Sequence, residues 1–206
     1  MSVAPARPDE PAGAVRPARR WLPVWVVLGV IAVSVLGGFV TAAALPAGEA
    51  RPITVGGAIT VRPLPGWAVV RREDVASIPT ASGGTVEASF AQLSRGSGAL
   101  DVVAIAGLGV PPDRAAAFYV EAVLRAQLER PSVSALRPGV LPRGLPAVRF
   151  AYIGIEPTSG DAIEGNVTVT VGRSGVVAVF DGWGSEGQLE LIAEELETMV
   201  GDAQVT

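Results

Sequence analysis

An uncharged, apolar stretch near the N-terminus, residues 21–48, constrains this chain more than any other feature of its sequence. A helix needs about 20 apolar residues to cross the hydrocarbon core of a bilayer, and this stretch is long enough. Three basic residues, Arg16, Arg19 and Arg20, come directly before it. Because basic residues favour the cytoplasmic side, these three are topology determinants and predict a cytoplasmic N-terminus. We therefore expect a single transmembrane helix over residues 21–45 in the cell membrane, with the rest of the chain extracytoplasmic.

A cleaved signal peptide is the alternative interpretation of this segment. Ala42, Ala43 and Ala44 are small residues of the kind that precede a cleavage site. The apolar core of a signal peptide has about 7–15 residues, whereas Val24–Leu45 has 22. The length therefore favours a retained anchor. A lipid anchor added after export is excluded, because that modification needs a cysteine and the chain has none.

Small residues at a four-residue spacing, Ser34, Gly38 and Ala42, would share one face of the predicted membrane helix. Such faces let two helices pack closely, which would suit a homodimer or a membrane partner. Small residues are also frequent in membrane helices generally. We prefer this second interpretation and keep the packing face as the alternative.

The residue types that the chain lacks narrow its chemistry. It has no Cys, His or Lys, and all 16 of its basic residues are Arg. This composition is associated with GC-rich genomes such as those of actinobacteria. It removes thiolate nucleophiles, imidazole bases, Schiff-base lysines and metal sites built on His or Cys. Paired carboxylates remain possible in principle, but nothing in the spacing of the candidate acids indicates that they converge: Asp101, Asp161, Glu164 and Asp181.

Two further ligand classes are disfavoured. Residues 51–206 carry 12 Arg against 17 Asp and Glu, a net charge of −5, whereas nucleic-acid binding needs a basic face. Gly107 and Gly109 resemble the start of a dinucleotide-binding turn, but Pro112 occupies the position of the third glycine. We therefore expect no nucleic acid, cofactor, metal or catalytic residue, and no enzyme activity.

Composition also divides the chain. Residues 1–20 are rich in Pro, Ala and Arg and cannot bury enough apolar surface to fold, so we expect a disordered cytoplasmic tail. Residues 46–52 form a short linker. The remaining residues, 53–206, have the length of one domain with its own core.

Alternating apolar residues and turn signals predict seven strands in that domain: residues 58–62, 67–71, 85–94, 99–106, 147–155, 163–171 and 176–180. We expect the first two strands to form a hairpin and residues 133–141 to be irregular. Helical spacing predicts one helix from Pro111 to Arg130. A second helix follows Ser185, whose spacing from Gln188 is that of a capping box. Strands joined mostly by hairpins, with two amphipathic helices, indicate an α+β fold in which helices flank an antiparallel sheet.

A family resemblance is carried by Pro65-Gly66-Trp67 after the opening strand and by the order of the predicted elements. The chain resembles the Mog1/PsbP-like α/β/α sandwich, as in actinobacterial envelope proteins of the LpqN/LpqT lipoprotein type. It departs from those lipoproteins because their lipidated cysteine is missing. The resemblance implies this fold, an envelope location and a binding or accessory role. It carries over no catalytic residue.

Two tryptophans are the candidate partner-binding residues, because each follows a glycine at a strand edge: Trp67 and Trp183. They either cap the core, the usual fate of large aromatic side chains, or lie exposed and anchor a partner. We expect a non-catalytic, membrane-anchored envelope module with a protein partner. The alternative is a carrier that holds a lipid or another apolar molecule between the sheet and the helix around Ala117–Leu128.

Overall fold

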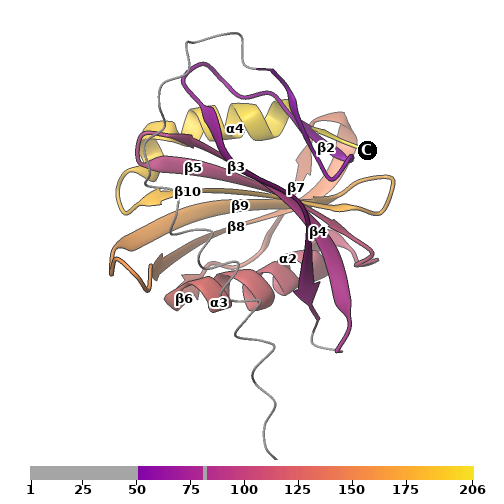
Figure 1. Ribbon diagram of the computed structural model, residues 1–206, viewed down its shortest axis with the longest axis horizontal. Helices are drawn as coiled ribbons and strands as arrows, with labels where there is room; N and C mark the ends of the chain where they lie inside the picture. The colour runs from indigo at the N-terminus through magenta and orange to yellow at the C-terminus, as the bar shows by residue number, and fades with distance from the viewer. Residues whose placement is uncertain (1–50, 81–82) are drawn as a thin grey trace, which may run out of the picture.

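A sheet of eight strands forms the middle layer of the domain, and a helix lies on each of its two faces (Figure 1). The computed structural model describes residues 51–80 and 83–206. Their architecture is α+β, with an antiparallel sheet and two helices, which confirms the predicted class at that level. The predicted tail and membrane helix, including Ser34, Gly38, Ala42 and the three N-terminal arginines, lie outside the described residues. Within the described ranges, no helix has the length and hydropathy that crossing a membrane requires.

The order of the strands in the large sheet is β3-β4-β5-β10-β9-β8-β6, and β7 pairs with β8. Every neighbouring pair in it is antiparallel. The predicted hairpin around the turn at residues 172–175 is confirmed, since Val171 pairs with Val177. The strands are β3 (Ala68–Pro79), β4 (Thr85–Arg95), β5 (Gly98–Ala106), β6 (Glu129–Val133), β7 (Arg137–Leu141), β8 (Leu145–Ile155), β9 (Ala162–Val171) and β10 (Val177–Ser185).

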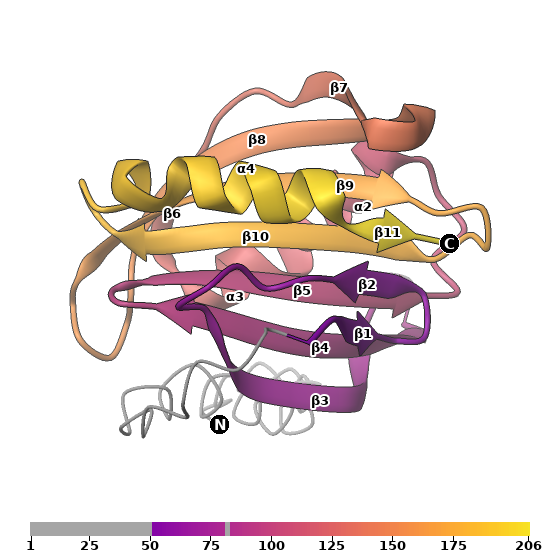
Figure 2. The same ribbon diagram turned by 90° about the horizontal axis from the view of Figure 1, so that it is seen from above.

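A second sheet, of three short strands, lies on the same side as helix α4 (Ala193–Asp202; Figure 2). It consists of β1 (Ile53–Val55), β2 (Ile59–Val61) and β11 (Gln204–Val205). The predicted hairpin between residues 58–62 and 67–71 is therefore wrong: β2 pairs with β1 and β11, whereas β3 pairs with β4. Between β2 and β3, a turn in which the Trp67 N–H donates to the Leu64 carbonyl carries the chain from one layer to the other.

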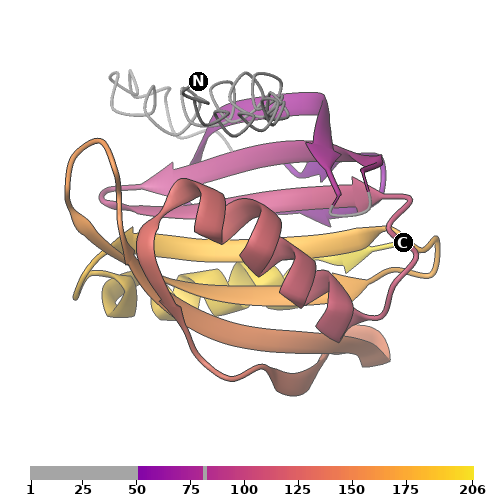
Figure 3. The same ribbon diagram turned by 90° about the horizontal axis from the view of Figure 1, so that it is seen from below.

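The first helix covers the face opposite α4 and contacts β8 and β9 (Figure 3). It runs continuously through α2 (Pro112–Tyr119), a π-helical turn η2 (Val120–Leu124) and α3 (Arg125–Gln127). The predicted start is close, since proline suits the first helical turn. The helix ends three residues before Arg130, because Leu128 already has an extended backbone.

The second helix, α4 (Ala193–Asp202), follows a 3₁₀ turn η4 (Leu189–Ile192). The predicted capping box is wrong. Ser185 belongs to β10, and no side chain caps the helix at Ile192. The Glu164 carboxylate instead accepts hydrogen bonds from the N–H groups of Gly187 (2.9 Å) and Leu189 (3.1 Å) at the start of this segment.

Two stretches without clear alternation are strands at the edges of the sheet. Residues 129–141, expected to be partly helical and partly irregular, form β6 and β7 beside β8. Edge strands tolerate proline and bulges, and β6 bulges at Arg130, which has a φ of 50°. At the other edge, β3 continues past Arg71 to Pro79 with two bulges of its own.

Apolar side chains fill both spaces between the sheet and the helices. On the α4 side, Phe180 and Leu100 pack with Met199 of the helix. On the α2 side, Val179 and Val103 pack with Ala115 and Tyr119. The polar residues that carry the candidate site are inserted into this second apolar layer.

Candidate functional site: a buried pair of aspartates

Two aspartates face each other in the middle of the sheet. Asp181 of β10 lies directly opposite Asp101 of β5 in the antiparallel register. Directly opposed residues point to the same side of a sheet, and opposed like charges destabilise it. Asp181 is 2% exposed, and Asp101 is half-buried beside it. Both side chains lie on the side covered by α2, the side of their neighbours Val179 and Val103.

Both tyrosines of the chain donate a hydrogen bond to Asp181. The Tyr119 hydroxyl, at the end of α2, lies 2.7 Å from Oδ2, and the Tyr152 hydroxyl, on β8, lies 3.1 Å from Oδ1. Both tyrosines are buried. Asp181 therefore joins three elements that are far apart in the sequence: β8, β10 and the first helix.

Gly165 makes the contact between Tyr152 and Asp181 possible. This glycine lies on β9, between the strands of the two bonded residues, and pairs with both Tyr152 and Trp183. A Cβ atom at residue 165 would lie 2.6 Å from the Tyr152 hydroxyl oxygen and closer still to two carbons of its ring. The tyrosine ring thus occupies the space that any side chain at Gly165 would need.

Asp101 has its own pair of donors. Gln92 Nε2 lies 2.9 Å from Oδ1, and Trp183 Nε1 lies 3.0 Å from Oδ2. The charge of Arg71, which lies opposite Gln92 on the edge strand β3, also acts on Asp101. This guanidinium is paired with Glu73 and lies 5.5 Å from the centre of the Phe90 ring. Four neutral donors, and one arginine that is itself paired with Glu73, therefore surround the two carboxyl groups.

This environment shifts both acids towards their protonated forms. Burial raises the pKa of Asp181 from 3.8 to about 7, and the charge of Asp101 adds to the rise against the two tyrosine hydrogen bonds. Burial also raises the pKa of Asp101 to about 6, and the bonds from Gln92 and Trp183 oppose it. Burial and the nearby Asp181 keep the pKa of both tyrosines well above its ordinary value. The site can hold a proton near neutral pH while the phenols stay donors.

Two surface hollows lie in the described part of the chain, and Tyr152 and Gly165, the neighbours of Asp181, line the first of them. One has a volume of about 320 Å³ and is lined by residues of β6, β8 and β9 and by Leu189, and the other measures about 290 Å³ near Gly56 and Val75. Neither is lined by Asp101, Asp181 or any residue of the first helix. In the described part of the chain, no three acidic side chains gather closely enough to hold a metal ion.

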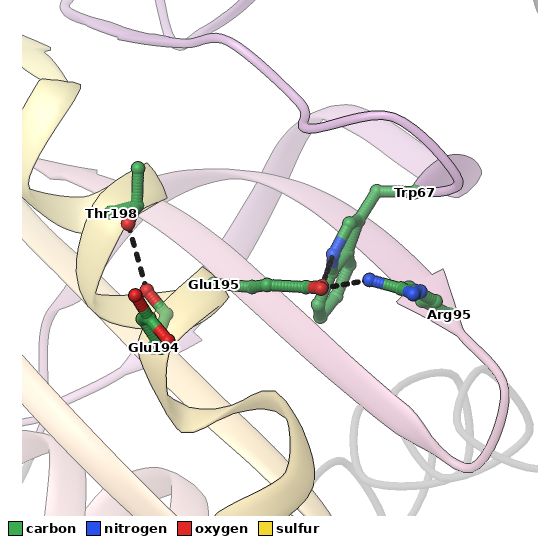
Figure 4. A network of polar contacts seen from close by, with 5 residues as sticks. All are labelled: Trp67, Arg95, Glu194, Glu195 and Thr198. Carbon is green, nitrogen blue, oxygen red and sulfur yellow. Dashed lines mark hydrogen bonds and ion pairs between the residues drawn. The ribbon is translucent and has the colours of Figure 1, made fainter.

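Trp67, one of the two candidate partner-binding residues, is 6% exposed and packs in the α4-side layer. Its Nε1 donates to Glu195 of α4 at 2.7 Å, and Arg95 pairs with the same carboxylate (Figure 4). These two donors, Arg95 first, lower the pKa of Glu195. Gly66, with a φ of 87°, makes the turn that brings the indole there. This burial is what the core-capping interpretation of Trp67 predicts, and a role of Trp67 in partner binding stays a prediction.

Trp183, the other candidate, is half-buried against the α2-side layer and donates to Asp101. Its role in partner binding remains a prediction. Among the acids considered from the sequence, Asp101 and Asp181 converge, whereas Asp161 lies in an exposed loop and Glu164 binds the segment before η4.

Comparison with known proteins adds no functional assignment. No protein-family model matches the chain, and no curated protein is significantly similar to it in sequence.

Proposed function

We propose that this protein is a non-catalytic binding module of the bacterial cell envelope. In this proposal, residues 21–45 anchor it in the cytoplasmic membrane, and residues 53–206 bind a protein partner on the outer side. The apolar stretch preceded by arginines supports the anchor and its orientation. The Pro65-Gly66-Trp67 turn and the order of the elements support a Mog1/PsbP-like fold.

The observation that carries the binding role is the open hollow beside η4. Ile153 projects from β8 into it and is 55% exposed, and its neighbours include the exposed residues Ser134, Ala151 and Asn166. A solvent-exposed aliphatic side chain surrounded by polar groups has the mixed character of a protein–protein contact. An enclosed ligand site would instead bury most of its ligand in a concave, mostly apolar pocket.

The carrier alternative has less support. It expects an apolar cavity lined by the first helix, and the two hollows described above contain no residue of that helix. The space beneath the helix is occupied by side chains, including Tyr119, Tyr152 and Val179. We therefore place the partner-binding surface at Ile153.

Site-directed photocrosslinking in the native membrane tests this proposal. A photoreactive phenylalanine analogue replaces Ile153 in the full-length protein, and the matched control carries it at Val140, which is 69% exposed on β7. We expect one discrete protein adduct at residue 153 that is absent at residue 140. The same adducts at both positions, or none at residue 153, would contradict the proposed surface.

A further inference from the structure

The counter-charge available to the pair formed by Asp101 and Asp181 is the guanidinium of Arg71, which acts on Asp101 and is already paired with Glu73. In residues 51–80 and 83–206, neither aspartate belongs to an ion pair. The groups that face the pair are Tyr119 from α2, Tyr152 from β8, Gln92 from β4, Trp183 from β10 and the paired Arg71 from β3. On β9, the uncharged residue Val167 lies opposite Asp181. Binding of a proton to one of the two carboxyl groups therefore reduces the repulsion between Asp101 and Asp181.

We propose that the Asp101–Asp181 pair is a proton-dependent latch that holds the first helix closed on the sheet. When the pair carries a proton, at most one negative charge lies beneath the helix, and the tyrosine bonds hold it. When both carboxyl groups are ionised, two opposed charges share a buried layer. Contact with water lowers the free energy of a buried charge. Movement of the first helix away from the sheet would give water access to Asp181.

The helix has a weak point beside the latch. Tyr119, which bonds Asp181, is the last residue of α2, and the next five residues, Val120–Leu124, form the π-helical turn. Single π-helical turns are irregularities within α-helices and frequently occur at functional sites. The helix can therefore open at this point without unfolding the sheet, as segments of lower local stability do in other proteins.

Hydrogen–deuterium exchange of the full-length protein in mild detergent tests the latch. Exchange is measured at pH 5 and pH 8 and divided by the intrinsic rate at each pH, so that it reports opening. We expect amides of residues 115–128 to open at least about tenfold more at pH 8, because each unit by which the pKa of Asp181 falls on opening favours the open state about tenfold once the carboxyl group is ionised. Amides of α4, on the opposite face, serve as the internal reference and should change much less.

Three variants separate the latch from a general effect of pH. Asp181→Asn, which is neutral and close in shape, should abolish the extra opening at pH 8, and Asp101→Asn should reduce it. Asp202→Asn, in an exposed position of α4, should behave like the unmodified protein. Equal opening of residues 115–128 at both pH values, or an unchanged difference in both Asp181→Asn and Asp101→Asn, would overturn the latch.

Discussion

Replacing Asp181 by Asn should stabilise the domain by about 2–4 kcal/mol at pH 8 and by much less at pH 4. An asparagine at this position still accepts a hydrogen bond from one tyrosine and can donate one to the other. It removes the charge that the buried site disfavours. We expect the free energy of unfolding to increase because Asp181 is 2% exposed and has no counter-ion among the described residues.

The direction of the effect follows from the pKa of Asp181. Its value rises from 3.8 to about 7 on folding, so the folded protein binds more protons than the unfolded chain between these values. The free energy of unfolding therefore falls as the pH rises from about 4 to about 7 and then becomes level. Each pKa unit corresponds to about 1.4 kcal/mol, which gives about 4 kcal/mol as the upper limit for this group.

Urea unfolding of the full-length protein at several values between pH 4 and pH 8 measures this profile. The difference between Asp181→Asn and the unmodified protein should grow with pH, while Asp202→Asn should show no such trend. A variant that is less stable at pH 8 than the unmodified protein would show that the Asp181 carboxylate stabilises the fold.

Replacing Gly165 by Ala should destabilise the domain by about 3 kcal/mol. The new methyl group would overlap the ring of Tyr152, which is buried. Overpacking of a core costs about 1–3 kcal/mol. A ring displaced from Gly165 also leaves Asp181 without one of its two donors, and losing a partner of a buried polar group costs a similar amount.

The matched control is Gly139→Ala on the edge strand β7, where an added Cβ meets nothing within 4 Å. Its effect should stay within about 1 kcal/mol. Tyr152→Phe supplies a double-mutant test. It should lower the free energy of unfolding clearly less in the Gly165→Ala background than in the unmodified protein, because Gly165→Ala has already broken the hydrogen bond from Tyr152 to Asp181. Additive effects of the two substitutions would show that Gly165 does not act through this bond.

Local sequence patterns predicted much of the fold. Alternation located the central strands, and the Gly172–Gly175 turn identified the β9–β10 hairpin, because adjacent strands joined by a short turn pair with each other. Pairing between distant segments has no comparable local signal. Residues 59–61 have the pattern of a strand in either sheet, and only the tertiary structure places them between β1 and β11.

The edge strands were missed for a related reason. Pro131 in β6 and Pro138 in β7 break the pattern of a central strand, and the sequence alone does not tell which segments lie at an edge. The structure tolerates both prolines because these strands pair on one side only, with β8.

The sequence around the two aspartates does contain a sign of the site, although their spacing does not show that they converge. Asp101 lies within an apolar run and Asp181 directly follows one, as expected of central strands, and a carboxyl group in such a strand requires hydrogen-bond partners. The chain has two tyrosines, and the phenol hydroxyl groups of both donate hydrogen bonds to Asp181. The convergence itself depends on the pairing of β5 with β10 across a long stretch of sequence, so it became visible only in the fold.

The most direct test of this account is a carboxyl-carbon NMR titration of the full-length protein labelled at aspartate, with the two signals assigned from Asp101→Asn and Asp181→Asn. We predict that Asp181 titrates near pH 7 and Asp101 near pH 6, well above the ordinary value for aspartate. If both signals titrate below pH 5, the pair is ionised at neutral pH without a penalty, and the latch is contradicted.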